Sequence, residues 1–125
     1  MNHLRILICL ALLSATACNS APQLDDFDAD AWRSDVLGCQ GKRLEQVTAL
    51  IEQKDKLIGK SQHDIMALLG TPDEHELYER TRKFFFYHLD PAAACADSST
   101  DNSTGRDLSL RFNALDMCSE VIIRY

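Results

Sequence analysis

Cysteine and histidine are the residue types in this sequence that could act as nucleophiles or metal ligands, and the chain has five of the first and four of the second. A cysteine nucleophile needs a neighbouring base and a shaped pocket. No histidine lies at a recognisable spacing from Cys118. His63, His75, Asp73 and Glu76 do not lie together on a firmly predicted helix, so a metal site is not indicated. We therefore expect no enzyme activity, no catalytic residue, and neither a metal nor another cofactor.

Cys18 lies in a context that predicts covalent lipid attachment. A weakly basic start, an uncharged apolar run over residues 6–13 and the small residues 14–17 follow one another, which is the order of a secretory signal peptide. The run Ala15-Thr16-Ala17-Cys18 resembles a lipobox, in which the cysteine thiol forms a thioether to diacylglycerol. We expect removal of residues 1–17, with diacylglycerol and an N-acyl chain on Cys18. Cleavage after Ala17 without lipid is the alternative.

The lipid would hold the mature chain on a membrane, because two or three acyl chains anchor a protein stably. The apolar run is about half the roughly 20 residues of a spanning helix, so no transmembrane segment is expected. Asn19 is not the aspartate that favours retention in the inner membrane of enteric bacteria. We therefore expect a Gram-negative outer membrane, with the protein facing the periplasm or, alternatively, the cell surface.

The mature chain would be a small acidic protein. Residues 18–125 hold 12 basic and 19 acidic residues, a formal charge of −7 with neutral histidines. This charge argues against nucleic acid as a partner, because phosphate contacts dominate such binding, and against electrostatic attraction to anionic lipids. Residues 18–31 are polar and acidic, which is typical of a flexible tether. Residues 32–125 are long enough for one domain with one core.

The apolar periodicity predicts two helices followed by strands. Apolar residues recur at helical spacing over residues 42–56. A second helix over residues 61–69 begins at the N-cap residue Ser61 and ends at Gly70, ahead of Pro72. The period then changes to two, which predicts strands at 83–89, 106–113 and 120–125 and a short edge strand at 74–79. We expect an α+β domain in which the two N-terminal helices pack on one face of a three- or four-stranded antiparallel meander.

Three cysteines remain in the mature chain besides the lipidated one, and an oxidising compartment favours one disulfide among them. In an antiparallel meander, Cys95 and Cys118 lie at opposite ends of one strand, about 20 Å apart at roughly 3.3 Å per residue. A disulfide needs Cα atoms within about 7 Å. The topology therefore favours Cys39–Cys95, which would clip a strap over residues 32–41 to a loop over residues 90–105. Cys118 would then be a free thiol.

Two motifs carry a resemblance to a known family. One is Gly59-Lys60-Ser61-x-x-Asp64-Ile65-x-x-Leu68-Leu69-Gly70-Thr71-Pro72, and the other is Leu108-Ser109-Leu110-Arg111-Phe112-Asn113, with Phe85-Phe86-Tyr87 upstream. Over residues 44–125 the sequence resembles the small-protein-A/outer-membrane-lipoprotein-A family, the BamE-like small bacterial lipoproteins. The resemblance implies a two-helix, three-stranded α+β domain that binds other proteins and has no active site. The two-helix-on-sheet unit also resembles that of the β-lactamase inhibitor proteins.

The resemblance also divides the strand residues between the two faces of the sheet. The side chains that it places against the helices are Phe85, Tyr87, Leu89, Leu108, Leu110 and Phe112. Phe84, Phe86 and His88 would then lie on the open face. Exposed apolar patches tend to mark partner sites, so we predict a partner-binding surface there. The alternative is that the loop over residues 90–105 or the strap covers these rings.

Basic residues flank the predicted surface and could orient an acidic partner. They are Arg82, Lys83, Arg111 and Arg124. The sequence therefore predicts a lipid-anchored binding or scaffold module in outer-membrane maintenance or assembly. Its partner would be an outer-membrane or periplasmic protein, and no small-molecule substrate is expected. The alternative is an inhibitor or protective protein that occludes a periplasmic enzyme.

Overall fold

The computed structural model describes residues 21–79, 81–95 and 105–125. The predicted signal peptide and Cys18 therefore lie outside the described residues. The helical elements in chain order are α2 (Ala29–Ser34), the 3-10 turn η2 (Val36–Gly38), α3 (Lys42–Glu52), the 3-10 turn η3 (Lys54–Lys56) and α4 (Gln62–Leu69). The strands are β1 (Glu74–Tyr78), β2 (Arg82–His88), β3 (Asp107–Phe112) and β4 (Cys118–Arg124). Within the described ranges, no helix is both long and apolar enough to cross a membrane.

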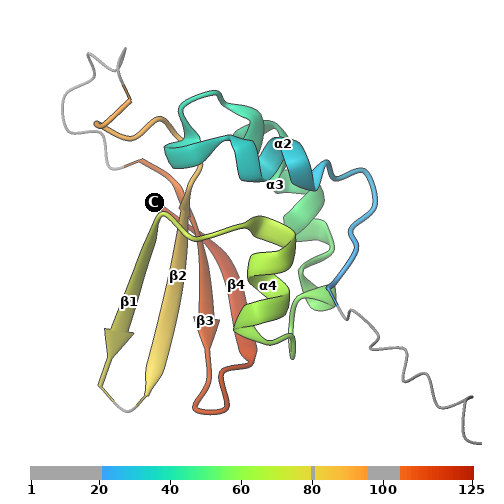
Figure 1. Ribbon diagram of the computed structural model, residues 1–125, viewed down its shortest axis with the longest axis vertical. Helices are drawn as coiled ribbons and strands as arrows, with labels where there is room; N and C mark the ends of the chain where they lie inside the picture. The colour runs from blue at the N-terminus through green and yellow to red at the C-terminus, as the bar shows by residue number, and fades with distance from the viewer. Residues whose placement is uncertain (1–20, 80, 96–104) are drawn as a thin grey trace, which may run out of the picture.

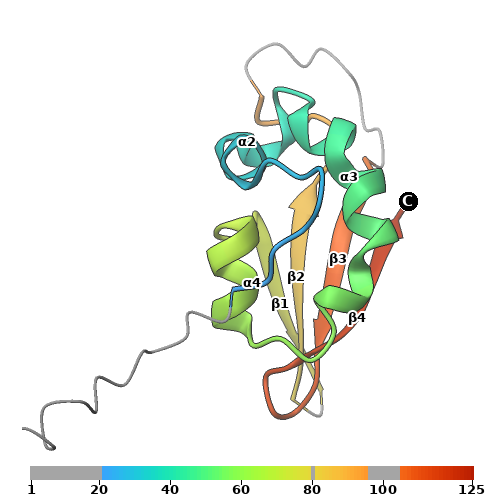
Figure 2. The same cartoon turned by 90° about the vertical axis from the view of Figure 1, so that its right-hand side faces the viewer.

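The four strands form one antiparallel sheet in the order β1-β2-β3-β4, with each strand paired to its neighbour in sequence. The helices lie together on one face of this sheet (Figures 1 and 2). The predicted α+β class is therefore confirmed, and the short edge strand makes the sheet four-stranded. The sequence did not predict α2, which adds a third helix to the two that were expected.

The helix α4 forms where its ends predicted it. The hydroxyl of Ser61 accepts a hydrogen bond from the backbone N–H of Asp64 at 3.1 Å, as an N-cap residue should. Gly70 ends the helix with a positive φ of 79°, a backbone conformation that glycine adopts at little cost. The cap and the terminating glycine therefore fix both the length and the position of α4.

Residues 21–31 do not form the flexible tether that was expected over residues 18–31. Pro22 is buried, and Leu24 and Phe27 pack against the core. Asp28 caps α2 by accepting a hydrogen bond from the N–H of Ala31 at 3.0 Å. The acidic composition suggested a tether, but the apolar side chains between the aspartates hold this segment on the body.

Two glutamines of α3 bind this N-terminal segment through its backbone. The side-chain amide of Gln53 accepts from the N–H of Asp25 at 2.7 Å and donates to its carbonyl at 2.8 Å. Gln46 makes the same pair of bonds to Asp28, at 2.6 and 3.2 Å. Each glutamine thus satisfies both backbone groups of one residue, as a neighbouring strand would.

One core lies between the sheet and the helices. It includes all six side chains that the resemblance placed there, which are Phe85 and Tyr87 of β2, Leu89 just after β2, and Leu108, Leu110 and Phe112 of β3. The helical side contributes Leu50, Ile65 and Leu69, which are fully buried. Trp32 of α2 is also fully buried. The expected assignment of these six side chains to the helix-facing side of the sheet is therefore confirmed.

A buried ion pair joins the helices to the sheet. The guanidinium of Arg43 on α3 binds the carboxylate of Asp73, and both side chains are no more than 3% exposed. Arg43 Nε also donates to the carbonyl of Trp32 at 3.1 Å. Asp73 accepts in addition from the N–H of Leu37 at 3.2 Å and from that of His88 at 2.8 Å.

The strap over residues 32–41, which leads from α2 to α3, packs against the end of β2. A Cβ at Gly38 would lie 2.8 Å from the carbonyl oxygen of His88 and 2.9 Å from that of Asp90, so a side chain there would clash with backbone. Next to it, Cys39 and Cys95 form a disulfide with Cα atoms 5.6 Å apart. This is the pairing that the topology favoured, and Cys118 is a free, buried cysteine.

Substitution of Asp73 by Asn should destabilise the fold strongly, because it leaves the Arg43 charge buried without its counter-ion. Removal of one partner of such a pair costs about 3–5 kcal/mol. We expect urea unfolding to report a loss of this size for Asp73→Asn and for Arg43→Met, and the double variant to lose less than the sum. The matched control is Asp116→Asn, which breaks the exposed Lys83–Asp116 pair and should cost about 1 kcal/mol or less. Equal losses at the two pairs would contradict this role for the buried pair.

Candidate functional site

The face of the sheet opposite the helices carries a mixed set of aromatic and charged side chains. No described helix covers it (Figures 1 and 2). Across the strands the register sets Phe86 beside Ser109 and Ser109 beside Ile122, and it sets Phe84 beside Arg111. These neighbours alternate with the core residues along each strand, so they belong to the open face.

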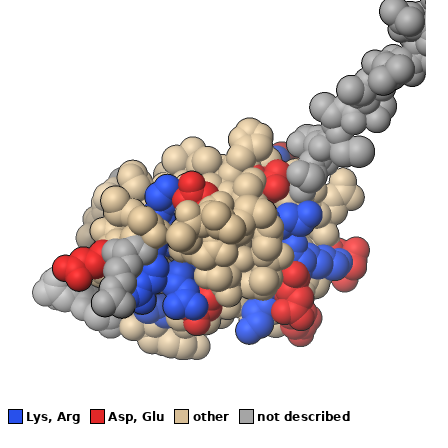
Figure 3. All heavy atoms as spheres, turned by 90° about the horizontal axis from the view of Figure 1, so that it is seen from below, with Lys and Arg blue, Asp and Glu red and all other residues tan. Residues whose placement is uncertain are grey.

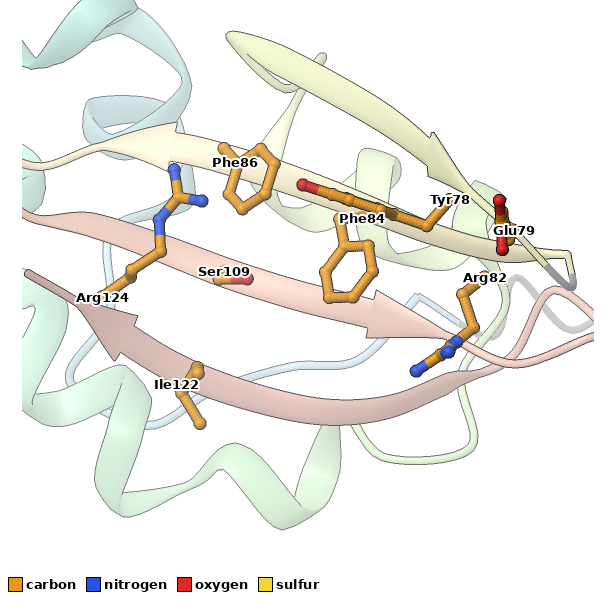
Figure 4. A pocket seen from close by; sticks show the side chains of 8 residues that line it. All are labelled: Tyr78, Glu79, Arg82, Phe84, Phe86, Ser109, Ile122 and Arg124. Atoms are coloured by element: carbon orange, nitrogen blue, oxygen red, sulfur yellow. The ribbon is translucent and has the colours of Figure 1, made fainter.

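A groove of about 520 Å³ runs over this face (Figure 4). Its lining residues come from all four strands and from the turn between β1 and β2. They are Tyr78, Glu79, Arg82, Phe84, Phe86, Ser109, Ile122 and Arg124. Figure 4 shows the rings of Phe84 and Phe86 in the middle of the groove, with Arg82 toward one end and Arg124 toward the other. The groove is therefore apolar in the middle and has a guanidinium at each end.

Stacked rings form the floor of the groove. Phe84 and Phe86 lie with centroids 6.1 Å apart and planes within 7°. The ring of Tyr78 meets Phe84 edge-on at 5.3 Å. The guanidinium of Arg124 lies 4.1 Å from the centroid of Phe86, a distance at which a cation is attracted to the ring face.

These contacts explain how two phenylalanines can lie on an open face. Phe86 is 2% exposed and Phe84 is partly buried. The Arg124 guanidinium, rather than the strap, lies on Phe86. The second suggested cover, the loop over residues 90–105, lies outside the described residues from 96 to 104. Among the described residues, the side chain of Arg124 covers Phe86, and a partner that enters the groove could contact this arginine directly.

An ionic chain holds Arg124 in place. Arg124 Nη2 donates to Asp107 Oδ2 at 2.9 Å, and the other oxygen of Asp107 lies 2.6 Å from His88 Nδ1. His88 Nε2 in turn lies 3.2 Å from a carboxylate oxygen of Glu74. Asp107 is buried on the open face, so the direction of the Arg124 side chain is set by a group that itself has little freedom.

The structure brings together three of the five predicted partner-binding residues. Phe84, Phe86 and Arg124 line the groove. His88 lies beside it, within the ionic chain that supports Arg124, and does not line it. Arg111 is also outside the lining and pairs with Glu120 at 3.3 Å.

Four lining residues were absent from the predicted site, namely Tyr78, Glu79, Ser109 and Ile122. The positions of the three strand residues follow from the period of two in β1, β3 and β4, once the four strands are known to pair in order. Glu79 lies just after β1. A hydrogen bond to the Glu76 carboxylate raises the pKa of Tyr78, and the charge of that carboxylate acts in the same direction. The Tyr78 hydroxyl therefore stays protonated and can take part in hydrogen bonds at any physiological pH.

Cys118, the nucleophile considered from the sequence, begins β4 on the far side from the groove. It is 2% exposed, and its thiol donates to the carbonyl of Glu120 at 3.8 Å. Burial raises the pKa of Cys118 to about 11. Among the described residues, no group of three or more His, Cys, Asp or Glu side chains is placed to hold a metal ion.

No protein-family model, curated protein or solved structure matches this chain. We therefore infer the function from the geometry of the groove and from the sequence motifs.

The thiol of Cys118 should react slowly in the native protein, because a pKa of about 11 leaves little thiolate at neutral pH. We expect Ellman's reagent at pH 8 to react about 100-fold faster after unfolding in guanidinium, where a cysteine has a pKa near 8.5. The rate in the native state should keep rising with pH toward 11 instead of levelling near 8.5. A soluble form that lacks residues 1–17 and carries Cys18→Ala offers a single free thiol to follow. Fast modification of the native form would show an activated, accessible thiol and contradict this description.

Proposed function

We propose that this protein is a lipid-anchored protein-binding module of the outer membrane, acting in outer-membrane maintenance or assembly. The observation that carries the proposal is the groove of aromatic and arginine side chains on the helix-free face of the sheet. The lipobox-like sequence at Cys18 supports the anchor and the periplasmic or surface location. The resemblance to the BamE-like lipoproteins agrees with both.

The composition of the groove fits a protein partner. Tyrosine, phenylalanine and arginine are enriched at protein interfaces, and arginine and tyrosine are frequent among the residues that contribute most to affinity. The ring stack and the Arg124–Asp107 pair hold these side chains in place before binding. Little side-chain entropy remains to be lost on association, which favours affinity.

The charges of the groove indicate the chemistry of the partner. Arg82 is exposed, and in the described part of the chain it has no ion pair within 4.0 Å. The guanidinium of Arg124 lies over Phe86, four residues from Arg82 along β2, or about 13 Å at 3.3 Å per residue. A partner segment of about four extended residues, apolar in the middle and carrying a carboxylate at each end, would match this spacing.

A photo-crosslinking amino acid at Ile122 tests the proposal in intact cells. Ile122 is 45% exposed and lines the groove, so we expect a covalent adduct with an envelope protein. The control is the same crosslinker at Leu115, which is exposed but lies in the turn between β3 and β4. Adducts of equal yield at both positions would contradict a specific site.

Charge reversal tests the arginine contribution separately from folding. Arg82→Glu should reduce the Ile122 adduct at least fivefold, because a guanidinium is lost where a partner carboxylate would bind. Lys83→Glu makes the same change of charge on the next residue, whose ammonium pairs with Asp116 outside the groove. That variant should keep the adduct. Melting curves of both variants provide the check on folding, and an unchanged adduct in Arg82→Glu would refute the acidic partner.

Deletion of the gene tests the role in the envelope. A scaffold in outer-membrane maintenance should leave the cell sensitive to detergent when it is lost. Loss of an inhibitor should instead raise one hydrolytic activity of the periplasm, with the outer membrane intact.

A further inference from the structure

The N-terminal segment packs on the helix side of the body, and this packing determines which side of the body lies nearest to an upstream anchor. The N-terminal segment, drawn in blue, starts beside α4 on the outer side of the helix layer, and the open face of the sheet lies on the opposite side of the molecule (Figures 1 and 2). From there the segment runs between α3 and α4 toward α2 (Figure 2). Any anchor upstream of Ala21 therefore connects to the helix layer and not to the sheet.

The segment is fastened close to its start. Pro22 is buried, and Leu24 packs against the core. Asp25 exchanges two backbone hydrogen bonds with Gln53, and its carboxylate lies 3.2 Å from the ammonium of Lys56 on η3. The point of attachment to the body is thus Pro22 to Asp25, on the helix side.

The distance from this point to the proposed lipid is short. Cys18 precedes Ala21 by three residues. Three residues span at most about 11 Å when fully extended. This length is similar to the diameter of one helix, about 10–12 Å, so the chain is too short to let the body turn over on the membrane.

We infer that the head-group surface of the anchoring bilayer is the partner of the helix layer, and that the groove on the sheet faces away from the lipid. The inference rests on the proposed lipidation of Cys18. It assigns the surface formed by η3, the following turn and α4 to the phospholipid head groups. A helix layer and a sheet lie between the lipid and the groove, on the order of 20 Å in total.

The assigned surface has side chains suited to the head-group region. Lys54 and Lys56 of η3 are exposed, and lysines near a membrane are attracted by anionic lipid. The exposed Asp55 lies between them and Lys56 pairs with Asp25, so their net attraction is small. Ile58 is 41% exposed and Met66 of α4 is 37% exposed. Seen from below, basic side chains, with acidic ones among them, gather beside the start of the described chain (Figure 3). The net charge of the whole chain is −6, so the lipid, and not electrostatic attraction, should supply most of the binding.

This orientation has a consequence for partner binding. A groove on the far side of the body is open to proteins that approach from the aqueous compartment. It is also at a height where the soluble portion of a neighbouring membrane protein could reach it. If the groove faced the bilayer instead, the short tether of about 11 Å would hold it against the lipid, and a protein partner could not enter it.

Fluorescence quenching in vesicles tests the orientation. Lipidated protein from the membrane fraction is reconstituted in phosphatidylethanolamine–phosphatidylglycerol vesicles that contain a lipid with a nitroxide on its head group. A fluorophore is attached to Met66→Cys on the helix side or to Ile122→Cys in the groove. The native cysteines of the described body are in a disulfide or buried, so the introduced thiol is the one that is labelled. We expect at least threefold stronger quenching at position 66, and equal or reversed quenching overturns the inference.

A longer tether provides the matched control. Twenty Gly and Ser residues inserted between Ser20 and Ala21 should make the quenching at the two positions nearly equal, because the body can then turn over. A difference that persists unchanged would show that tether length does not set the orientation, and would overturn the argument. Failure of the lipid anchor is recognised independently: the protein would carry no acyl mass and would not sediment with vesicles. Partner capture through Ile122 is a separate measurement and can succeed or fail regardless of the quenching result.

Discussion

The buried pair of Arg43 and Asp73 is the interaction on which the arrangement of this molecule depends. Burial of two charges is costly unless their remaining hydrogen-bonding groups are satisfied. Here the carboxylate accepts from two backbone N–H groups as well as from the guanidinium. The guanidinium also lies against the rings of Trp32 and Tyr87, at 5.7 and 5.5 Å from their centroids. The pair thereby joins α2, η2, α3, the segment before β1 and the end of β2.

This junction separates the two faces of the molecule. Because the strap and α3 are held at one end of β2, the N-terminal segment packs on the helix side, along α3 and near α4. The opposite face of the sheet is left to its own side chains, and they cover one another by ring stacking and by the Arg124–Asp107–His88 chain. We propose that the first face meets lipid and the second meets protein. The same junction therefore supports both proposed contacts.

Local sequence signals were sufficient to predict the elements whose ends depend on neighbouring residues. They were not sufficient where contacts between distant residues determine the structure. Ser61 and Gly70 define α4 through bonds and backbone angles that involve adjacent residues, so the sequence shows them directly. The helix α2 has six residues and depends on Trp32 in the core and on glutamine side chains of α3, which no local pattern reveals. The burial of Arg43 could not be foreseen either, since a single arginine on a predicted helix normally faces water.

The same distinction applies to the candidate site. The face assignment that the resemblance implied is correct for Phe84 and Phe86, and the flanking Arg124 lies on Phe86. Whether a side chain there is available depends on its neighbours across the strands, and these require the register. The pairing of His88 with Asp107, and of Arg111 with Glu120, removes two predicted residues from the groove. The Cys39–Cys95 disulfide could be predicted from the sequence, because the order of the strands places Cys95 and Cys118 far apart and so disfavours a bond between them.

Both the proposed location and the proposed orientation of the protein follow from the lipid on Cys18. Mass spectrometry of the N-terminal peptide of the protein taken from membranes tests this lipid most directly. We expect a chain that begins at residue 18 and carries diacylglycerol and an amide-linked acyl chain, and a Cys18→Ala form that is absent from the membrane fraction. An unmodified Cys18, or a Cys18→Ala form that fractionates like the wild type, would contradict the proposed lipidation.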